Sequence, residues 1–219
     1  KESLQQMIGL AQRKKLKLGV LFLDLDGFKR INDTLGHHLG DLVLQATSER
    51  LQKSIRISDT FAQPVTSQGD ISLARLGGDE FTALLPLIER NEDAAIVAER
   101  IRIKLAQPMI FGEHELTTTT SIGIAIYPDD GETTEDLLKN ADLAMYYAKR
   151  SGGNTYCYFS SYMMERAVRK LTMESHLRKA VEREEFCLHY QPQFDIERGN
   201  FNGVEVLLRW ENKELGKIS

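Results

Sequence analysis

The chain has 219 residues, 42% of them hydrophobic, with 28 basic and 32 acidic residues and a formal net charge of −4. This composition is that of a globular protein with a proper core, and the mixed charge argues against a nucleic-acid-binding or membrane-bound surface. No apolar run approaches the roughly 20 residues that span a bilayer. Cys157 and Cys187 lack CxxC spacing, which argues against a disulfide framework or zinc site and indicates a reducing compartment. We therefore expect a cytoplasmic location, with an upstream anchor to the inner membrane left open because the sequence does not begin with Met.

The first predicted elements are a helix, a buried strand and a second helix. Residues 3–15 place apolar side chains at helical spacing. Residues 19–24 are almost continuously apolar, as in a strand buried on both faces, and an acidic turn follows at 24–27. A helix is expected from about His37. The polar stretch 63–70, with Pro and Gly, is expected to be a loop or hairpin excursion.

The middle of the chain predicts alternating strands and helices. Two short apolar runs flank Gly77-Gly78-Asp79-Glu80, which is a β-hairpin signal. Thr133 and Asp136 form a capping pair ahead of the clearest helix. In chain order we expect strands at 71–76 and 81–85, a helix at 93–105, two strands within 109–127, a helix at about 135–150 and a closing strand at 155–159. This order favours an α+β fold, a mixed sheet with helices packed on its faces.

The end of the chain changes character. Residues 160–184 are charge-rich and helical, typical of an interdomain helix. Residues 186–194 and 201–210 alternate with period two around a turn, which predicts a second hairpin that belongs to another domain. The expected division is therefore 1–159, 160–184 and 185–219.

Two acidic clusters suggest a nucleotide site that uses a divalent metal. Asp24 and Asp26 end a strand, and Asp79 and Glu80 occupy the hairpin turn. Hard carboxylate oxygens hold Mg²⁺ together with substrate phosphates, and glycines at Gly77-Gly78 let a backbone approach a phosphate closely. The alternative is that acidic residues and glycines simply populate turns.

Five motifs, which follow one another along the chain in the same order as in the family, resemble those of the GGDEF diguanylate cyclases. They are RLGGDEF at 75–81, FLDLDGFKRINDTLGH at 22–37, Gly40-Asp41, SIGIA at 121–125 and ADLAMYYAK at 141–149. The resemblance covers roughly residues 1–159. It implies a ferredoxin-like palm of the nucleotide cyclase type, which condenses two GTP molecules into cyclic di-GMP and two pyrophosphates in bacterial second-messenger signalling.

The resemblance also implies a role for each matching residue. The metal ions, Mg²⁺ or Mn²⁺, would be held by Asp24, the backbone carbonyl of Leu25 and Asp79. Asp79 and Glu80 would be the catalytic pair. Substrate would be bound by Lys29, Asn32, His37, Asp41, Gly77, Gly78 and Lys149, with Asn32 and Asp41 reading the guanine and the lysines meeting phosphates. For Asn32 and Asp41 the alternative is local helix capping.

The product implies the assembly. Because each domain holds one GTP and the product is two-fold symmetric, the working unit is expected to be a homodimer with facing half-sites. We expect no nucleic-acid partner and no membrane contact by these residues.

The sequence departs from the family pattern at three places. Arg56 and Asp59 have the letters of an inhibitory product site, but an insertion at about 63–74 separates them from Arg75. Gly153 stands where the family commonly has a basic residue, so phosphate binding loses a charge, worth about 1–3 kcal/mol. Gly27 replaces a bulkier residue in the first turn.

The tail resembles the start of the EAL cyclic-di-GMP phosphodiesterases, a TIM-barrel-like fold. The matching runs are LHYQP at 188–192 and GVEVLLRW at 203–210, with Val206 in place of Ala. Glu205 would be a metal ligand, and Gln191 and Arg209 would lie near the dinucleotide; the alternative for Glu205 is an ordinary polar strand residue. Such a barrel needs roughly 200–250 residues, so no hydrolysis is expected from this segment alone.

Two alternatives to a working cyclase stay open. One is a GTP-binding GGDEF domain that regulates an attached EAL phosphodiesterase, which the insertion and Gly153 favour and the intact Asp24, Asp79 and Glu80 oppose. The other is an interaction scaffold without nucleotide, which predicts acidic clusters without metal affinity.

Overall fold

The computed structural model describes residues 2–55 and 72–218, which fall into two compact units, 1–163 and 164–219. The predicted excursion at 63–70 lies outside the described residues, as do Arg56 and Asp59. None of the helices in the described ranges is both long enough and apolar enough to cross a membrane.

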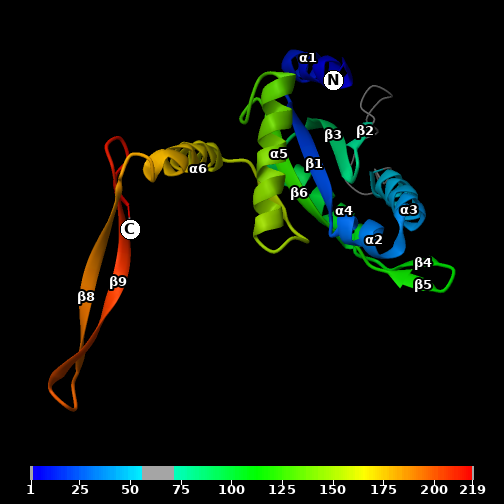
Figure 1. Ribbon diagram of the computed structural model, residues 1–219. Coiled ribbons are helices and arrows are strands. Elements are labelled where there is room, and N and C mark those ends of the chain that lie inside the picture. The colour runs from blue at the N-terminus through cyan, green and yellow to red at the C-terminus, as the bar shows by residue number, and fades with distance from the viewer. Residues whose placement is uncertain (1, 56–71, 219) are drawn as a thin grey trace. The chain divides into compact units, whose positions relative to one another are not determined.

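A mixed five-stranded sheet forms the centre of the first unit, in the order β2-β3-β1-β6-β7 (Figure 1). The middle strand β1 (Lys17–Asp26) pairs antiparallel with β3 (Glu80–Ile88) and with β6 (Thr119–Tyr127). The edges are β2 (Ser72–Gly77), antiparallel to β3, and β7 (Tyr156–Tyr158), parallel to β6. The predicted hairpin around Gly77–Glu80 is thus β2–β3.

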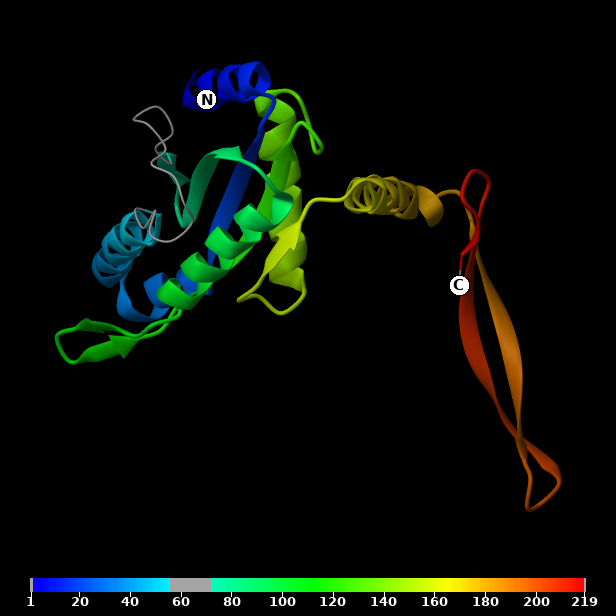
Figure 2. The same cartoon turned by 180° about the vertical axis from the view of Figure 1, so that it is seen from behind.

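Helices cover both faces of this sheet, as Figures 1 and 2 show from opposite sides. α1 (Glu2–Lys14) and α5 (Thr134–Arg150) pack on the face that carries Val20 and Phe22. α2 (Phe28–Leu35), α3 (His37–Ile55) and α4 (Asn91–Leu105) pack on the face that carries Leu21, Leu23 and Leu25. Since successive strand residues point to opposite faces, β1 serves both cores, which explains its unbroken apolar run and confirms the α+β prediction.

The prediction of two strands within 109–127 is wrong, because the structure has three. β4 (Met109–Phe111) and β5 (His114–Leu116) form their own two-stranded hairpin, and only β6 enters the main sheet. Gly112 supplies the left-handed backbone of that tight turn, with φ of +61°. The predicted cap of α5 is confirmed, because the Asp136 amide donates to Thr133 Oγ1 at 3.1 Å.

The second unit begins within α6 (Ser161–Ala180) and continues with β8 (Phe186–Asp195), β9 (Asn200–Asn212) and β10 (Gly216–Ile218). The predicted hairpin is confirmed as β8–β9, and β10 is an addition that the sequence did not predict. Glu185 accepts hydrogen bonds from Trp210 Nε1 at 2.8 Å and from Asn212 Nδ2 at 2.9 Å. These bonds hold the start of β8 against the end of β9.

Candidate functional site

Asp24 lies near the C-terminal end of the central strand β1. Asp24 is only 7% exposed and pairs across the sheet with Glu80 of β3 on one side and with Ser121 of β6 on the other. The hydroxyl of Thr120 donates to the Asp24 carbonyl at 2.9 Å. Two neighbouring strands therefore fix the backbone of Asp24, and its side chain is buried.

The Gly-Gly turn folds back onto the end of β1. The Leu25 amide donates to the Asp79 carbonyl at 3.3 Å, which ties the turn to the strand that carries Asp24. Arg75 braces the turn from within, because its Nε and Nη2 donate to the Gly78 carbonyl at 3.0 and 2.7 Å. Gly78 has φ of +55°, a conformation that favours glycine. The turn thus presents Asp79 and Glu80 beside Asp24.

The last turn of α5 brings Lys149 to the same place. Its Nζ donates to Asp24 Oδ1 at 2.6 Å. α5 reaches the sheet closely because β6 has a glycine under it: a Cβ on Gly123 would lie 1.9 Å from the Ala141 carbonyl oxygen. The small residue in the SIGIA motif therefore sets the depth at which α5, and with it Lys149, is seated.

Burial and mutual repulsion change the acidity of these groups. Burial raises the pKa of Asp24; the hydrogen bond and charge of Lys149 lower it, and the charges of Asp79 and Asp26 raise it further. Burial also raises the pKa of Glu80, and the negative charges of Asp142, Asp24 and Asp79 add to that rise against Lys149. Burial lowers the pKa of Lys149, but Asp24 and the other carboxylates outweigh it and the net shift is upward. The site holds more negative charge than Lys149 compensates, so it favours a further cation.

The structure separates Asp26 from the metal cluster in which the sequence placed it. Ser121 Oγ donates to Asp26 Oδ1 at 2.6 Å, and Thr119 Oγ1 donates to Oδ2 at 2.7 Å. The Asn154 amide also donates to Oδ2, at 2.9 Å. Both carboxylate oxygens are already used by protein donors, so Asp26 belongs to the scaffold of the site.

The donors that remain suit magnesium. Within residues 2–55 and 72–218, no three acidic, His or Cys side chains are preassembled around one point as a metal cage. Mg²⁺ usually needs only one or two carboxylates, because substrate phosphates and waters complete its shell. Asp24 and Asp79, with the carbonyl of Leu25, fit that requirement.

The residues predicted to read the base lie on α2 and α3, the two helices that follow β1 in the chain. Asn32 Oδ1 is buried, and it has no hydrogen-bond partner in the part of the chain that the structure describes. Gly40 leaves it room, since a Cβ there would lie 1.8 Å from that oxygen. Asp41 and His37 on α3 are exposed, as is Lys29 on α2. A buried acceptor left without a donor is costly, and a purine edge can supply one.

The predicted EAL residues all lie in the β8–β9 hairpin. Gln191 pairs with Glu205 across the two strands, and both are exposed. The Arg209 guanidinium donates to the neighbouring Leu208 carbonyl at 2.9 Å. The three residues therefore lie in one hairpin, and their roles in metal and dinucleotide binding stay predictions.

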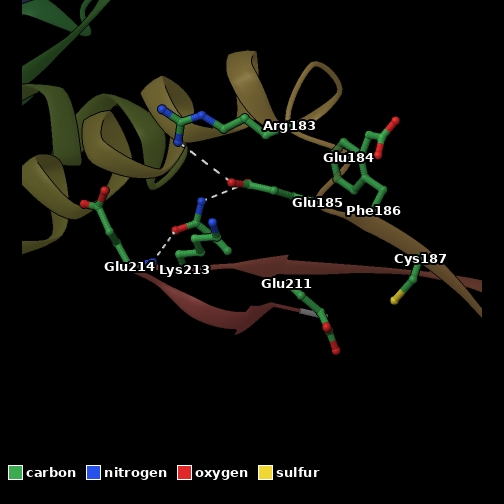
Figure 3. A pocket seen from close by; sticks show the side chains of 9 residues that line it. Arg183, Glu184, Glu185, Phe186, Cys187, Glu211, Lys213 and Glu214 are labelled. Atoms are coloured by element: carbon green, nitrogen blue, oxygen red, sulfur yellow. Dashed lines mark hydrogen bonds and ion pairs between the residues drawn. The ribbon is translucent and has the colours of Figure 1, made fainter.

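A pocket of about 630 Å³ in the second unit has no predicted site residue in its wall (Figure 3). It is lined by 183–187 and 211–214, which include four glutamates against one arginine and one lysine. An acidic wall of this kind repels a nucleotide phosphate. The pocket is therefore a poor candidate for the predicted nucleotide site, since it has neither the predicted residues nor a predominantly basic wall.

Sequence reasoning missed Asp142 and Asn154. Asp142 lies two helical turns before Lys149, on the same side of α5, and its negative charge raises the pKa of Glu80. The residue is exposed as a whole, yet enough protein surrounds its carboxyl to raise its own pKa by burial. Spacing of seven residues from Lys149 was the available signal for Asp142. Asn154 acts through its backbone amide, which no residue pattern reveals.

Comparison with known proteins agrees with this geometry. The family model described as diguanylate cyclase, GGDEF domain, matches residues 1–155, and the EAL domain model matches residues 174–219. The bifunctional diguanylate cyclase/cyclic di-GMP phosphodiesterase MucR of Pseudomonas aeruginosa is 44% identical over 218 residues, which is 100% of this chain and 30% of MucR. The cyclic di-GMP phosphodiesterase NbdA of the same species is 40% identical over 92% of this chain and 24% of its own length. The chain thus spans less than a third of these relatives.

Solved structures share the fold of the first unit. The GGDEF domain of YfiN (TpbB) from Pseudomonas aeruginosa aligns with a TM-score of 0.68 at 34% identity, over 77% of this chain and 91% of that one. The GGDEF domain of DgcB from Caulobacter crescentus, solved in complex with c-di-GMP, aligns with a TM-score of 0.60 at 26% identity, over 72% and 86%. The chain belongs to the GGDEF diguanylate cyclase family, and the start of an EAL domain follows in its second unit.

Proposed function

We propose that this chain contains a working diguanylate cyclase domain, which condenses two GTP molecules into cyclic di-GMP and two pyrophosphates. The observation that carries the proposal is the Leu25–Asp79 hydrogen bond, which brings the Gly-Gly turn onto the strand end of Asp24. Lys149 joins them at 2.6 Å from Asp24. Carboxylates and a lysine in this arrangement suit a metal-bound triphosphate.

The chain's residues divide the work of holding GTP. Asp24, Asp79 and the Leu25 carbonyl hold Mg²⁺, or Mn²⁺, which when bound neutralises phosphate charge and lowers the pKa of a bound hydroxyl. Lys149 and Lys29 contact phosphates, and the glycines of the turn let the backbone approach them. Asn32 and Asp41 bind the guanine edge, where the unpartnered Asn32 oxygen accepts a hydrogen bond. His37 borders the base on α3.

The reaction forms two phosphodiester bonds and breaks two phosphoanhydride bonds. The 3′-hydroxyl of each GTP attacks the α-phosphorus of the other, and pyrophosphate leaves. Asp79 and Glu80 accept the hydroxyl protons; burial and nearby carboxylates raise the pKa of Glu80, which makes it a better proton acceptor than an ordinary glutamate. Each subunit brings one GTP, so the proposal requires a homodimer with facing half-sites.

The rest of the layout belongs to the same proposal. We assign 1–159 to the cyclase domain, 160–184 to an interdomain helix and 185–219 to the start of an EAL domain. In that domain Glu205 is a metal ligand, and Gln191 and Arg209 bind the dinucleotide together with residues from the rest of an EAL barrel. We place the domain in the cytoplasm, where GTP is available and where the free thiols of Cys157 and Cys187 stay reduced. Neither nucleic acid nor a membrane is a partner of these residues.

The test is incubation of the purified chain at high concentration with GTP and Mg²⁺, followed by chromatography for cyclic di-GMP and pyrophosphate. Asp79→Ala is the control. Products in a 1:2 ratio that disappear in the control support the cyclase. Tight Mg²⁺-dependent GTP binding without product supports a different function.

That second function is regulation of an attached EAL phosphodiesterase by bound GTP. Gly153 favours it, because the site lacks a basic side chain at that position. The similarity to NbdA, a phosphodiesterase by name, agrees with it. If GTP with Mg²⁺ does not raise the melting temperature of the chain, both functions are contradicted. The remaining alternative is then an interaction scaffold that binds no nucleotide.

A further inference from the structure

The carboxylate of Asp26 joins three separate segments of the first unit. Its oxygens accept from Ser121 Oγ and Thr119 Oγ1 on β6, and from the Asn154 amide beyond the end of α5. Distances of 2.6 to 2.9 Å are those of charge-assisted hydrogen bonds, which are about twice as strong as neutral ones. The end of β1, the start of β6 and the turn after α5 therefore meet at one side chain.

The turn after α5 wraps closely around this carboxylate. Gly152, Gly153 and Asn154 all have positive φ, of +114°, +71° and +46°. A Cβ on Gly153 would lie 3.0 Å from Asp26 Oδ2, at the limit of close contact. On its other side the turn is tied to α4, because Arg102 Nη1 donates to Asn154 Oδ1 at 3.1 Å. The left-handed backbone is thus held by contacts on both sides.

The same turn ends the helix that carries Lys149. The Gly153 amide donates to the Ala148 carbonyl at 3.3 Å, so the turn closes directly onto the last turn of α5. Lys149 itself contacts Asp24, two residues before Asp26 on β1. Two links therefore join the end of α5 to the end of β1, one through the ammonium group and one through the turn.

We propose that Asp26 is a positioning residue, which fixes the turn 151–154 and thereby holds Lys149 at the phosphate end of the GTP site. The proposal rests on the function proposed above. It explains why an acidic residue can lie next to a triphosphate site. The Asp26 carboxylate accepts hydrogen bonds from donors within the protein, and these bonds place the positive charge of Lys149.

The sign of one substitution separates this role from the alternatives. If Asp26 acted only through its charge, Asp26→Asn would strengthen GTP binding, because it removes a negative charge near phosphates. If it served only general stability, binding of GTP and of guanosine would weaken together. A positioning role through Lys149 predicts weaker GTP binding with guanosine binding unchanged, since guanosine has no phosphate.

The experiment measures affinity for GTP and for guanosine in the whole chain. For Asp26→Asn we expect a roughly tenfold loss for GTP, the scale of one charged hydrogen bond, and no change for guanosine. In a Lys149→Ala background, Asp26→Asn should add no further loss. Glu135→Gln, exposed in the first turn of α5, removes the same charge at the far end of the helix and should change neither affinity. Tighter GTP binding, equal losses for both ligands, or an undiminished loss without Lys149 would overturn the proposal.

Amide hydrogen exchange of the ligand-free chain provides an independent readout. Asp26→Asn should speed exchange at Asn154 and leave α1 unchanged, whereas unaltered exchange at Asn154 would overturn the proposal. If Asp26→Asn fails to fold, Thr119→Val removes one donor and should cause the same changes to a smaller degree. A wild-type chain that binds no GTP would contradict the proposed function, while the exchange measurement would still decide whether Asp26 fixes the turn.

Discussion

The end of the site that we propose for phosphate (the phosphate end) and the end that we propose for the base (the base end) differ in how many of their polar groups have protein partners. At the phosphate end, Asp24, the Gly-Gly turn and Lys149 are joined by protein hydrogen bonds. At the base end, a buried Asn32 oxygen has no partner among the described residues. The protein itself supplies partners for the charged groups at the first end, whereas at the second it leaves one buried acceptor that a ligand can satisfy.

The largest expected effect comes from breaking the phosphate end at Asp24. Asp24→Asn removes the buried carboxylate that would hold the metal and that Lys149 contacts, so we expect turnover of GTP to fall roughly a thousandfold, equivalent to several kcal/mol. Initial rates of pyrophosphate release measure this. Glu113→Gln, exposed in the β4–β5 turn, should keep full activity. Retained turnover in Asp24→Asn would place the metal elsewhere.

The packing of α5 on the sheet is tested at Gly123. Gly123→Ala would place a Cβ 1.9 Å from the Ala141 carbonyl oxygen, so α5 must move off the sheet. We expect the free energy of unfolding to fall by about 3 kcal/mol, at the upper end for overpacking. Urea denaturation measures this loss. Gly9→Ala on α1, where a Cβ meets nothing within 4 Å, should stabilise by up to about 1 kcal/mol through helix propensity. A Gly123→Ala variant with the same free energy of unfolding as Gly9→Ala would contradict this account, because it would mean that α5 can move off the sheet without loss of stability.

At the base end, we expect one substitution to raise the stability of the protein and to weaken its binding of GTP. Asn32→Ala removes the unpartnered acceptor, so we expect the free energy of unfolding to rise by about 1 kcal/mol and GTP affinity to fall about tenfold. Thermal melts and calorimetry measure the two quantities. Asp33→Ala, exposed on the same helix, controls for helix propensity and should leave affinity unchanged. A destabilised Asn32→Ala would show that this oxygen has a partner in the free protein.

The smallest effect concerns pH. Burial and the charges of Asp142, Asp24 and Asp79 raise the pKa of Glu80, so the folded state binds its proton more tightly than the unfolded state does. This group therefore costs stability above its folded pKa, and the cost disappears below the unfolded value of about 4.3. We expect Glu80→Gln to raise the free energy of unfolding at pH 7 but not at pH 4. A gain in the free energy of unfolding that has the same size at pH 4 and at pH 7 would contradict the crowding of carboxylates around Glu80.

Sequence patterns predicted much of the fold. β1 is apolar on both faces, and the capped helix α5 has apolar side chains at helical spacing along one face. The patterns also predicted that Asp24 and the Gly-Gly turn meet, since both end strands. They could not predict the role of Asp26, because a carboxylate that binds metal and one that accepts internal hydrogen bonds look the same in a sequence. Gly123 was visible only as a motif letter, since its function depends on a backbone atom of α5.

The most direct test of the central claim, that two subunits each bring one GTP, is to mix the wild-type chain with Asp79→Ala. Because the inactive variant would form dimers with wild-type subunits, a threefold excess of it should lower cyclic di-GMP production per wild-type subunit severalfold. Production that stays constant as the variant is added would contradict the account, because each wild-type subunit would then be acting without a facing half-site.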